Sequence, residues 1–238
     1  ADGSSSASYE FSYGASAASS LPASSRFHTG ASDASSAIAI DADWMVVADD
    51  EDQVLRLVNR QQSGLAGASF AMDASLGLVG GSEVDLEAST RNGSTLYWLG
   101  SHSNNASGDD RPNRERLFAT ALSGSGAGIG LTTLGFYAHL EDDLLAWDQA
   151  QGGSLGLAAS AAAGVQPEQP AGFNIEGLAM APDGSGAYLA FRAPTLPTSN
   201  RQQALIVPLL NIAELISLGG GPAGTARFGT PIQLDLGG

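Results

Sequence analysis

The chain has 238 residues, no cysteine, 31 glycines, and a formal net charge of −15 from 10 basic and 25 acidic residues. The lack of cysteine excludes a disulfide framework and a thiolate metal site, and the negative charge disfavours nucleic acid, whose phosphates bind basic surfaces. No apolar run approaches the roughly 20 residues of a membrane-spanning helix, so we expect no membrane span.

Residues 1–25 begin with alanine and are rich in serine and alanine. We expect this segment to be a flexible, processed N-terminus from which a targeting peptide has been removed. Together with the acidic, cysteine-free composition, it favours a periplasmic or secreted protein.

Residues 26–238 show short β-type runs separated by turn residues, in one domain with three repeats that start near residues 33, 85 and 174. In each repeat an acidic residue opens a strand and a tight turn leads to a second strand. A variable loop then leads to a third strand. The second strands (residues 44–48, 96–99 and 188–191) are nearly continuously apolar, as in sheets that are covered on both faces. The predicted fold is therefore an all-β propeller.

Residues 137–150 depart from this β pattern. Leucine and tryptophan recur there at helical spacing and acidic residues occupy the opposite face. We expect one inserted amphipathic helix, packed on the outside of the propeller.

The acidic residue that opens each repeat and the polar residue that ends its second strand are 15 or 16 positions apart. A hairpin of that length returns to the level where it began, and the innermost strands of a propeller line its channel. We therefore expect six residues to converge at one rim of the channel: Asp33, Asp49, Glu87, His102, Glu176 and Arg192.

Four consecutive carboxylates, residues 49–52, suit a hard cation that is bound through oxygen. The predicted ligands of Ca²⁺ or another divalent cation are Asp33, Asp49, Asp50 and Glu87. The alternative interpretation is a solvated acidic turn, because the segment lacks the spacing and glycine of an EF-hand loop.

The candidate catalytic residues are His102, Glu176 and Arg192. A neutral imidazole near carboxylates can act as a general base, and an arginine can hold a phosphate or carboxylate with two hydrogen bonds. The alternatives are a structural histidine at a strand end and a simple Arg192–Glu176 ion pair. The sequence contains no nucleophile elbow, zinc-protease motif or Walker A loop.

The ordered motifs SDASSAIAI (32–40), WMVVADDEDQVLRL (44–57), FNIEGLAMAPDG (173–184) and ARFGTPIQLDLGG (226–238) resemble a bacterial family of unknown function related to phytase-like esterase propellers. The resemblance implies a β-propeller. It also implies that similar proteins continue beyond the last motif.

At about 45 residues per blade, the chain has room for about four to five blades at most. We therefore expect an incomplete ring, which a missing or separate C-terminal fragment of the same precursor completes.

Two functional hypotheses follow. The first is a metal-assisted phosphoester or ester hydrolase of phytase-like type that acts on a small anionic substrate. The second is a non-catalytic propeller that binds a protein or carbohydrate partner at the same rim.

Overall fold

The computed structural model describes residues 25–80, 83–197, 202–216 and 224–237. The predicted N-terminal segment, residues 1–25, lies outside the described residues except for its last position. Among the residues described, no helix is both long enough and apolar enough to cross a bilayer.

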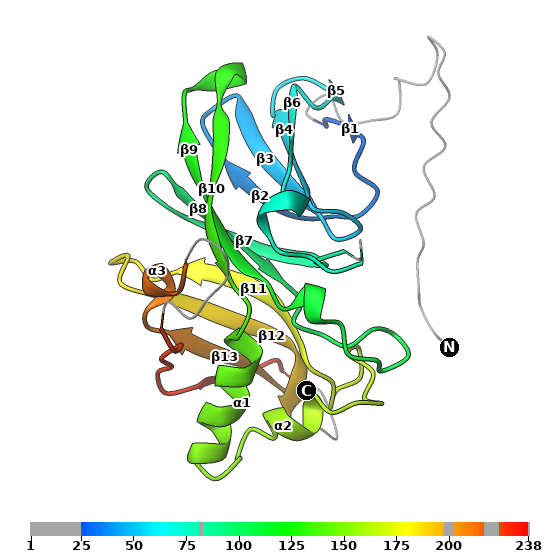
Figure 1. Cartoon of the computed structure of the whole chain (residues 1–238), viewed down its shortest axis with the longest axis vertical. Helices are drawn as coiled ribbons and strands as arrows, with labels where there is room; N and C mark the ends of the chain where they lie inside the picture. The colour runs from blue at the N-terminus through cyan, green and yellow to red at the C-terminus, as the bar shows by residue number, and fades with distance from the viewer. Residues whose placement is uncertain (1–24, 81–82, 198–201, 217–223, 238) are drawn as a thin grey trace.

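The molecule is built around three four-stranded antiparallel sheets (Figure 1). In each of them, the strands lie side by side in the order in which they occur along the chain. The first sheet contains β2 (Ala34–Ala39), β3 (Trp44–Asp49), β4 (Val54–Asn59) and β6 (Ala68–Ala71). The second contains β7 (Leu86–Asn92), β8 (Thr95–Gly100), β9 (Leu117–Ser123) and β10 (Gly130–Tyr137). The third contains β11 (Asn174–Met180), β12 (Ala187–Leu196), β13 (Gln203–Leu209) and β14 (Ile232–Asp235).

The remaining elements are short. A parallel pair joins β1 (His28–Thr29) to β5 (Gly64–Leu65). The helices are α1 (Leu140–Ala150), α2 (Leu157–Ser160) and α3 (Ile212–Leu215), with 3-10 turns η2 (Asp73–Ser75), η3 (Pro112–Arg114) and η4 (Gly126–Gly128).

Local turn chemistry sets the first hairpin of each sheet. The Asp41 carboxylate accepts hydrogen bonds from the backbone N–H groups of Asp43 and Trp44, both at 2.8 Å. Gly93 and Gly184 supply the positive φ that the corresponding turns of the second and third sheets require. The turns predicted from the sequence therefore fix where each hairpin reverses.

The second sheet is covered on both faces. Its Trp98 and Phe118 side chains pack with Val46 and Leu55 of the first sheet in one buried cluster. Its Leu99 lies in a second buried cluster, which includes much of the third sheet. The first strands of neighbouring sheets are in contact, β2 with β7 and β7 with β11, so the sheets stack along their first strands.

The all-β prediction is confirmed, and the three sheets begin close to the three predicted repeat starts. A stack of four-stranded antiparallel sheets is compatible with a propeller. The predicted helix also forms, as α1. Rather than standing apart from the core, α1 buries Leu140 and Leu144 in the cluster shared with the third sheet.

A buried carboxylate fixes the helical insertion. Asp148 is 1 % exposed, and its two oxygens accept hydrogen bonds at 3.0 Å from the backbone N–H groups of Leu155 and Leu157. These bonds tie the end of α1 to the start of α2.

We expect Asp148→Ala to lower the free energy of unfolding by about 2 to 4 kcal/mol, because two buried N–H groups lose a charged acceptor. Urea denaturation measures the change. Asp142→Ala, on the exposed side of the same helix, is the matched control and should cost less than about 1 kcal/mol. Equal losses in the two variants would contradict the assigned role of Asp148.

Candidate functional site

A cavity of about 230 Å³ lies at the end of the sheets where the first strands begin and the second strands end. Its lining comes from strands of the second and third sheets and from loops, including the loop after β3 of the first sheet. The lining residues are Asp50, Asp85, Glu87, Ser103, Ala106, Arg114, Pro167, Glu168, Asn174 and Arg192. Four carboxylates face two guanidinium groups there, so the cavity has a net negative formal charge.

Three of these carboxylates form a compact cluster. Asp50, Asp85 and Glu87 each offer one oxygen, and these oxygens lie within 4.8 Å of one another. Asp50 also belongs to a second such group, with Asp33 and Glu51. Asp50 is thus shared between the cavity and the acidic loop after β3.

A β-bulge places the acidic residue on β7. The register of β7 against β8 shifts between Leu86 and Ala88, so Glu87 is the extra residue. A bulge turns its extra residue away from the ordinary alternation of the strand. The same shift occurs in the first strands of the other two sheets, at Ser35 and Glu176.

Asp85 has an unusual backbone conformation. Its φ is 58°, in the left-handed region that residues other than glycine rarely adopt. Its carbonyl oxygen accepts a hydrogen bond from the Ser101 N–H at 2.9 Å, and its carboxylate is 2.8 Å from Arg114 Nη1. These contacts hold the side chain at the cavity.

The two arginines of the lining are already paired with acids. Besides its contact with Asp85, Arg114 forms an ion pair with Glu83, in which Arg114 Nη2 lies 2.9 Å from Glu83 Oε1. Arg192 Nη1 donates a hydrogen bond to Glu176 Oε1 at 2.9 Å, and Arg192 Nη2 lies 4.0 Å from Glu168 Oε1. Arg192 thus brings Glu176 to the edge of the cavity.

Two oxygen atoms of the lining have no hydrogen-bond partner among the described residues. They are Asp50 Oδ1 and Asn174 Oδ1, and both are inaccessible to solvent. The Asn174 side chain belongs to a residue only 5 % exposed, and its amide nitrogen donates to Glu176 at 3.2 Å. Buried polar atoms nearly always have a partner, and these two oxygens are available to accept one.

The carboxylates are costly to ionise together. Burial raises the pKa of Glu87 to about 7, and the charges of Asp85, Glu176 and Asp50 add to the effect. Burial and the charge of Asp33 raise the pKa of Asp50 to about 6. Burial also raises the pKa of Asp85, against the opposing effects of Ser101 and Arg114. A cation among them would remove this repulsion.

Asp49 lies outside both oxygen clusters. It is 1 % exposed, and its carboxylate accepts hydrogen bonds from the backbone N–H groups of Ser32, Asp33 and Glu51 at 2.8, 3.3 and 3.0 Å. Its oxygens are thus engaged with the segment before β2 and with the loop after β3. In this structure the Asp49 carboxylate therefore holds the neighbouring backbone, and its role as a metal ligand stays a prediction.

His102 is buried beside the site but is not among the residues that line the cavity. Its Nδ1 lies 2.8 Å from the Gly100 carbonyl oxygen, and burial lowers the pKa of the ring to about 4. The imidazole is therefore neutral at pH 7, with the proton on Nδ1. Its Nε2 is buried without a partner among the described residues.

Of the predicted site residues, the structure brings Asp50, Glu87 and Arg192 into one cavity, with Asp33 and Glu176 next to it. The sequence reasoning missed Asp85 and Asn174. The predicted repeats align Asp33 with Glu87. In the structure, Asp33 is instead equivalent to Asp85, because the carbonyl oxygen of each accepts a hydrogen bond from the N–H of the residue that follows the second strand of its sheet. The acidic residue two positions before Glu87 was the available signal for Asp85.

Residues 34–120 match the model of a family described as a protein of unknown function (DUF3616). The matched part runs from β2 into β9, so it contains Asp50, Asp85 and Glu87 but not Asn174 or Arg192. The match supports the resemblance of this part of the chain to an uncharacterised family. No curated protein shows significant sequence similarity to the chain.

The raised pKa of Glu87 predicts a pH-dependent stability. A carboxyl group whose pKa is higher in the folded state stabilises the fold at low pH, and this contribution is lost as pH rises from 4.5, the ordinary pKa of the group, through about 7. In EDTA, we therefore expect Glu87→Gln to leave the melting temperature nearly unchanged at pH 4 and to raise it at pH 8. Thermal unfolding at the two pH values measures this; a variant that is less stable at pH 8 would contradict it.

Proposed function

We propose that the chain binds one divalent cation, Ca²⁺, in the acidic cavity and uses it as a metal-assisted hydrolase of phosphoesters or related anionic esters. The observation that carries the proposal is the conjunction of three clustered carboxylates with a buried, unpartnered amide oxygen in one small cavity. Asp50, Asp85, Glu87 and Asn174 would hold the cation.

These residues fit a hard cation better than a soft one. All four offer oxygen, and Ca²⁺ takes six to eight oxygen ligands at about 2.3 to 2.6 Å from carboxylates, amide carbonyls and water. Oxygens around such an ion lie within about 5 Å of one another, which the spacing of the carboxylates satisfies. No cysteine is present to favour a thiophilic metal.

The cation would act as a Lewis acid that polarises a phosphoryl or carbonyl oxygen. Arg192 stands at the edge of the same cavity, and its side chain is 38 % exposed. It can therefore turn part of its guanidinium group toward an anionic substrate while it keeps its contact with Glu176. His102, with a neutral ring behind the lining, stays a candidate proton acceptor.

A non-catalytic role for the same cation is the second candidate. It is favoured by the ion pairs of Arg114 and Arg192, which leave neither guanidinium group without a carboxylate. In that case the cation would join the loops of the three sheets into a rim that binds a protein or carbohydrate partner.

We also propose a specific fold and a specific location for this protein. The three sheets are blades of a propeller, and the cavity lies where their first strands begin. The protein works in the periplasm or outside the cell, where calcium sites with dissociation constants of about 10⁻⁴ to 10⁻³ M are common.

Calcium titration tests the site. We expect wild-type protein to bind one Ca²⁺ by calorimetry and to gain about 2.7 kcal/mol of stability at a concentration 100 times the dissociation constant. Glu87→Gln and Asn174→Leu should each weaken binding at least about 10-fold. Asp43→Asn, an exposed acid in the turn at the opposite end of the first sheet, is the matched control. Unchanged affinity in both site variants would contradict the proposal.

Activity distinguishes the two candidates. With p-nitrophenyl phosphate and p-nitrophenyl acetate as probes, a hydrolase should turn over one of them in Ca²⁺ and not in EDTA. Arg192→Ala should then lower kcat/KM for the phosphoester at least about 10-fold, as expected when a charged contact to the substrate is lost. Calcium binding without turnover would leave the non-catalytic role.

A further inference from the structure

Arg192 faces two carboxylates at different distances. Its Nη1 donates a hydrogen bond to Glu176 Oε1 at 2.9 Å, whereas its Nη2 lies 4.0 Å from Glu168 Oε1, beyond hydrogen-bond range. The Glu176 side chain is 34 % exposed and that of Glu168 is 70 % exposed. One edge of the guanidinium group is therefore firmly paired, and the other meets an exposed carboxylate at longer range.

Glu176 belongs to the third sheet. It is the bulge residue of β11, and the oxygen that binds Arg192 also accepts a hydrogen bond from Asn174 Nδ2 at 3.2 Å. Asn174 itself is buried. The Arg192–Glu176 contact therefore joins the neighbouring strands β11 and β12, and we expect it to persist when a ligand enters the cavity.

Glu168 lies outside the sheets, in the segment between α2 and β11. Backbone hydrogen bonds hold this segment on both sides of Glu168. The Gly164 N–H donates to the Gly108 carbonyl oxygen at 2.8 Å, and the Thr195 N–H donates to the Pro170 carbonyl oxygen at 3.0 Å. With the backbone held in place, rotation of the Glu168 side chain can bring its carboxylate to the guanidinium group or release it into solvent.

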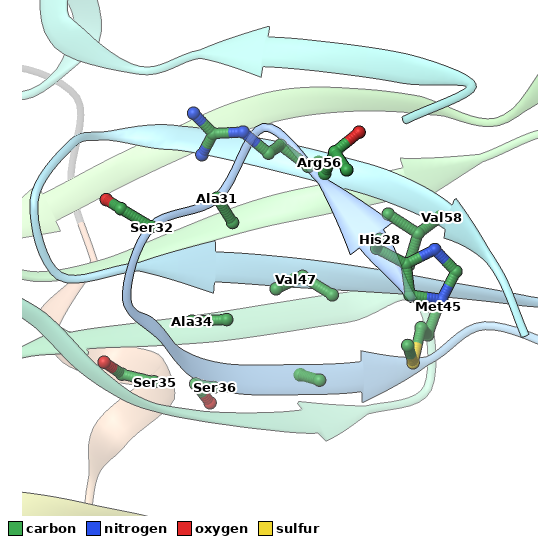
Figure 2. Close-up of a pocket in the computed structure, with 12 residues that line it drawn as sticks. His28, Ala31, Ser32, Ala34, Ser35, Ser36, Met45, Val47, Arg56 and Val58 are labelled. Carbon is green, nitrogen blue, oxygen red and sulfur yellow. The ribbon is translucent and has the colours of Figure 1, made fainter. Parts of the chain in front are cut away.

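Arg192 differs from two other arginines that line a cavity or groove. Arg56, in the groove that Figure 2 shows on the first sheet, donates from Nη1 and Nη2 to the two oxygens of Asp52 at 2.9 and 2.5 Å. Arg114 has a carboxylate within 2.9 Å of each of its Nη atoms. Among the described residues, no carboxylate lies within hydrogen-bond distance of Arg192 Nη2, so this atom is a charged donor to which an anion can bind.

We propose that Glu168 is an internal competitor for an anion at Arg192 Nη2. In the unliganded protein its carboxylate partly balances the guanidinium charge. An anionic group that enters the cavity takes the place of this carboxylate, while Glu176 keeps Nη1. Glu168 thereby regulates access to the anion-binding edge of the site. This role rests on the proposed function for the nature of the anion, which is there the anionic group of the substrate.

The competition is weak and local. Exposed ion pairs contribute little, so loss of the Glu168 carboxylate should strengthen anion binding only about 2- to 5-fold. The hydrogen bond to Glu176 and the charges of the nearby carboxylates raise the pKa of Arg192, so its guanidinium group stays charged when Glu168 leaves. Loss of a residue that merely supported the cavity wall would instead weaken anion binding.

Inorganic phosphate is the probe, titrated into the full chain and followed by NMR in Ca²⁺ and again in EDTA. We expect Glu168→Gln to tighten phosphate binding about 2- to 5-fold. Glu168→Asp, which keeps the charge but shortens the side chain, should tighten it less. Glu214→Gln is the matched control, because it removes the same charge from another exposed pair, with Arg227, and should leave the affinity unchanged.

A double-mutant cycle locates the effect. In an Arg192→Ala background, Glu168→Gln should give no gain, because the contact that it removes is already absent. Circular dichroism confirms that each variant is folded. Three results would overturn the competitor role: equal affinities of wild type and Glu168→Gln, an equal gain in Glu214→Gln, or no phosphate binding by wild type and Glu168→Gln in both buffers.

The outcomes distinguish this role from the proposed function. A gain from Glu168→Gln in EDTA, in a chain that binds no Ca²⁺, would support the competitor role and contradict the calcium site. Calcium binding and turnover, with a phosphate affinity that Glu168→Gln does not change, would overturn the competitor role alone.

Discussion

The structure depends on the burial of apolar residues on both faces of its sheets. Sheets of this kind need a neighbour on each side, and the second sheet has one: Trp98 packs toward the first sheet and Leu99 toward the third. Each nearly fully buried side chain of this size contributes about 1.5 to 3 kcal/mol of transfer free energy. Within the part of the chain that the structure describes, the third sheet leaves Ile232 and Leu234 of its last strand exposed.

Stacking also determines the chemistry of the cavity. Because the sheets meet along their first strands, the bulges at Ser35, Glu87 and Glu176 come to the same end of the molecule. Acidic side chains from loops far apart in the sequence then share one cavity, and burial makes their ionisation costly. The arginines offset part of the negative charge and hold the loops in position. A cation bound through oxygen would relieve the repulsion between the carboxylates. It would also give the unpartnered oxygens of Asp50 and Asn174 a partner.

Much of the fold could be predicted because it follows from local signals. Turn residues such as Gly93 mark where hairpins reverse, and the continuous apolar strand at residues 96–99 indicates a sheet covered on both faces. The helix at 140–150 follows from apolar spacing. Of the predicted metal ligands, Asp50 and Glu87 line the cavity, whereas the Asp49 carboxylate accepts hydrogen bonds from backbone N–H groups. A carboxylate in a loop gives no local sign of which hydrogen bonds it will accept.

The sequence by itself determined the strands, the turns, the repeat of one plan and the excess of acidic residues near strand ends. These features depend on neighbours along the chain, so alternation and spacing reveal them. Only the tertiary structure decided which carboxylates share a cavity, that Asn174 joins them, and that His102 is neutral and enclosed. Those outcomes depend on how separate sheets stack and how far each side chain is removed from water, which no local pattern encodes.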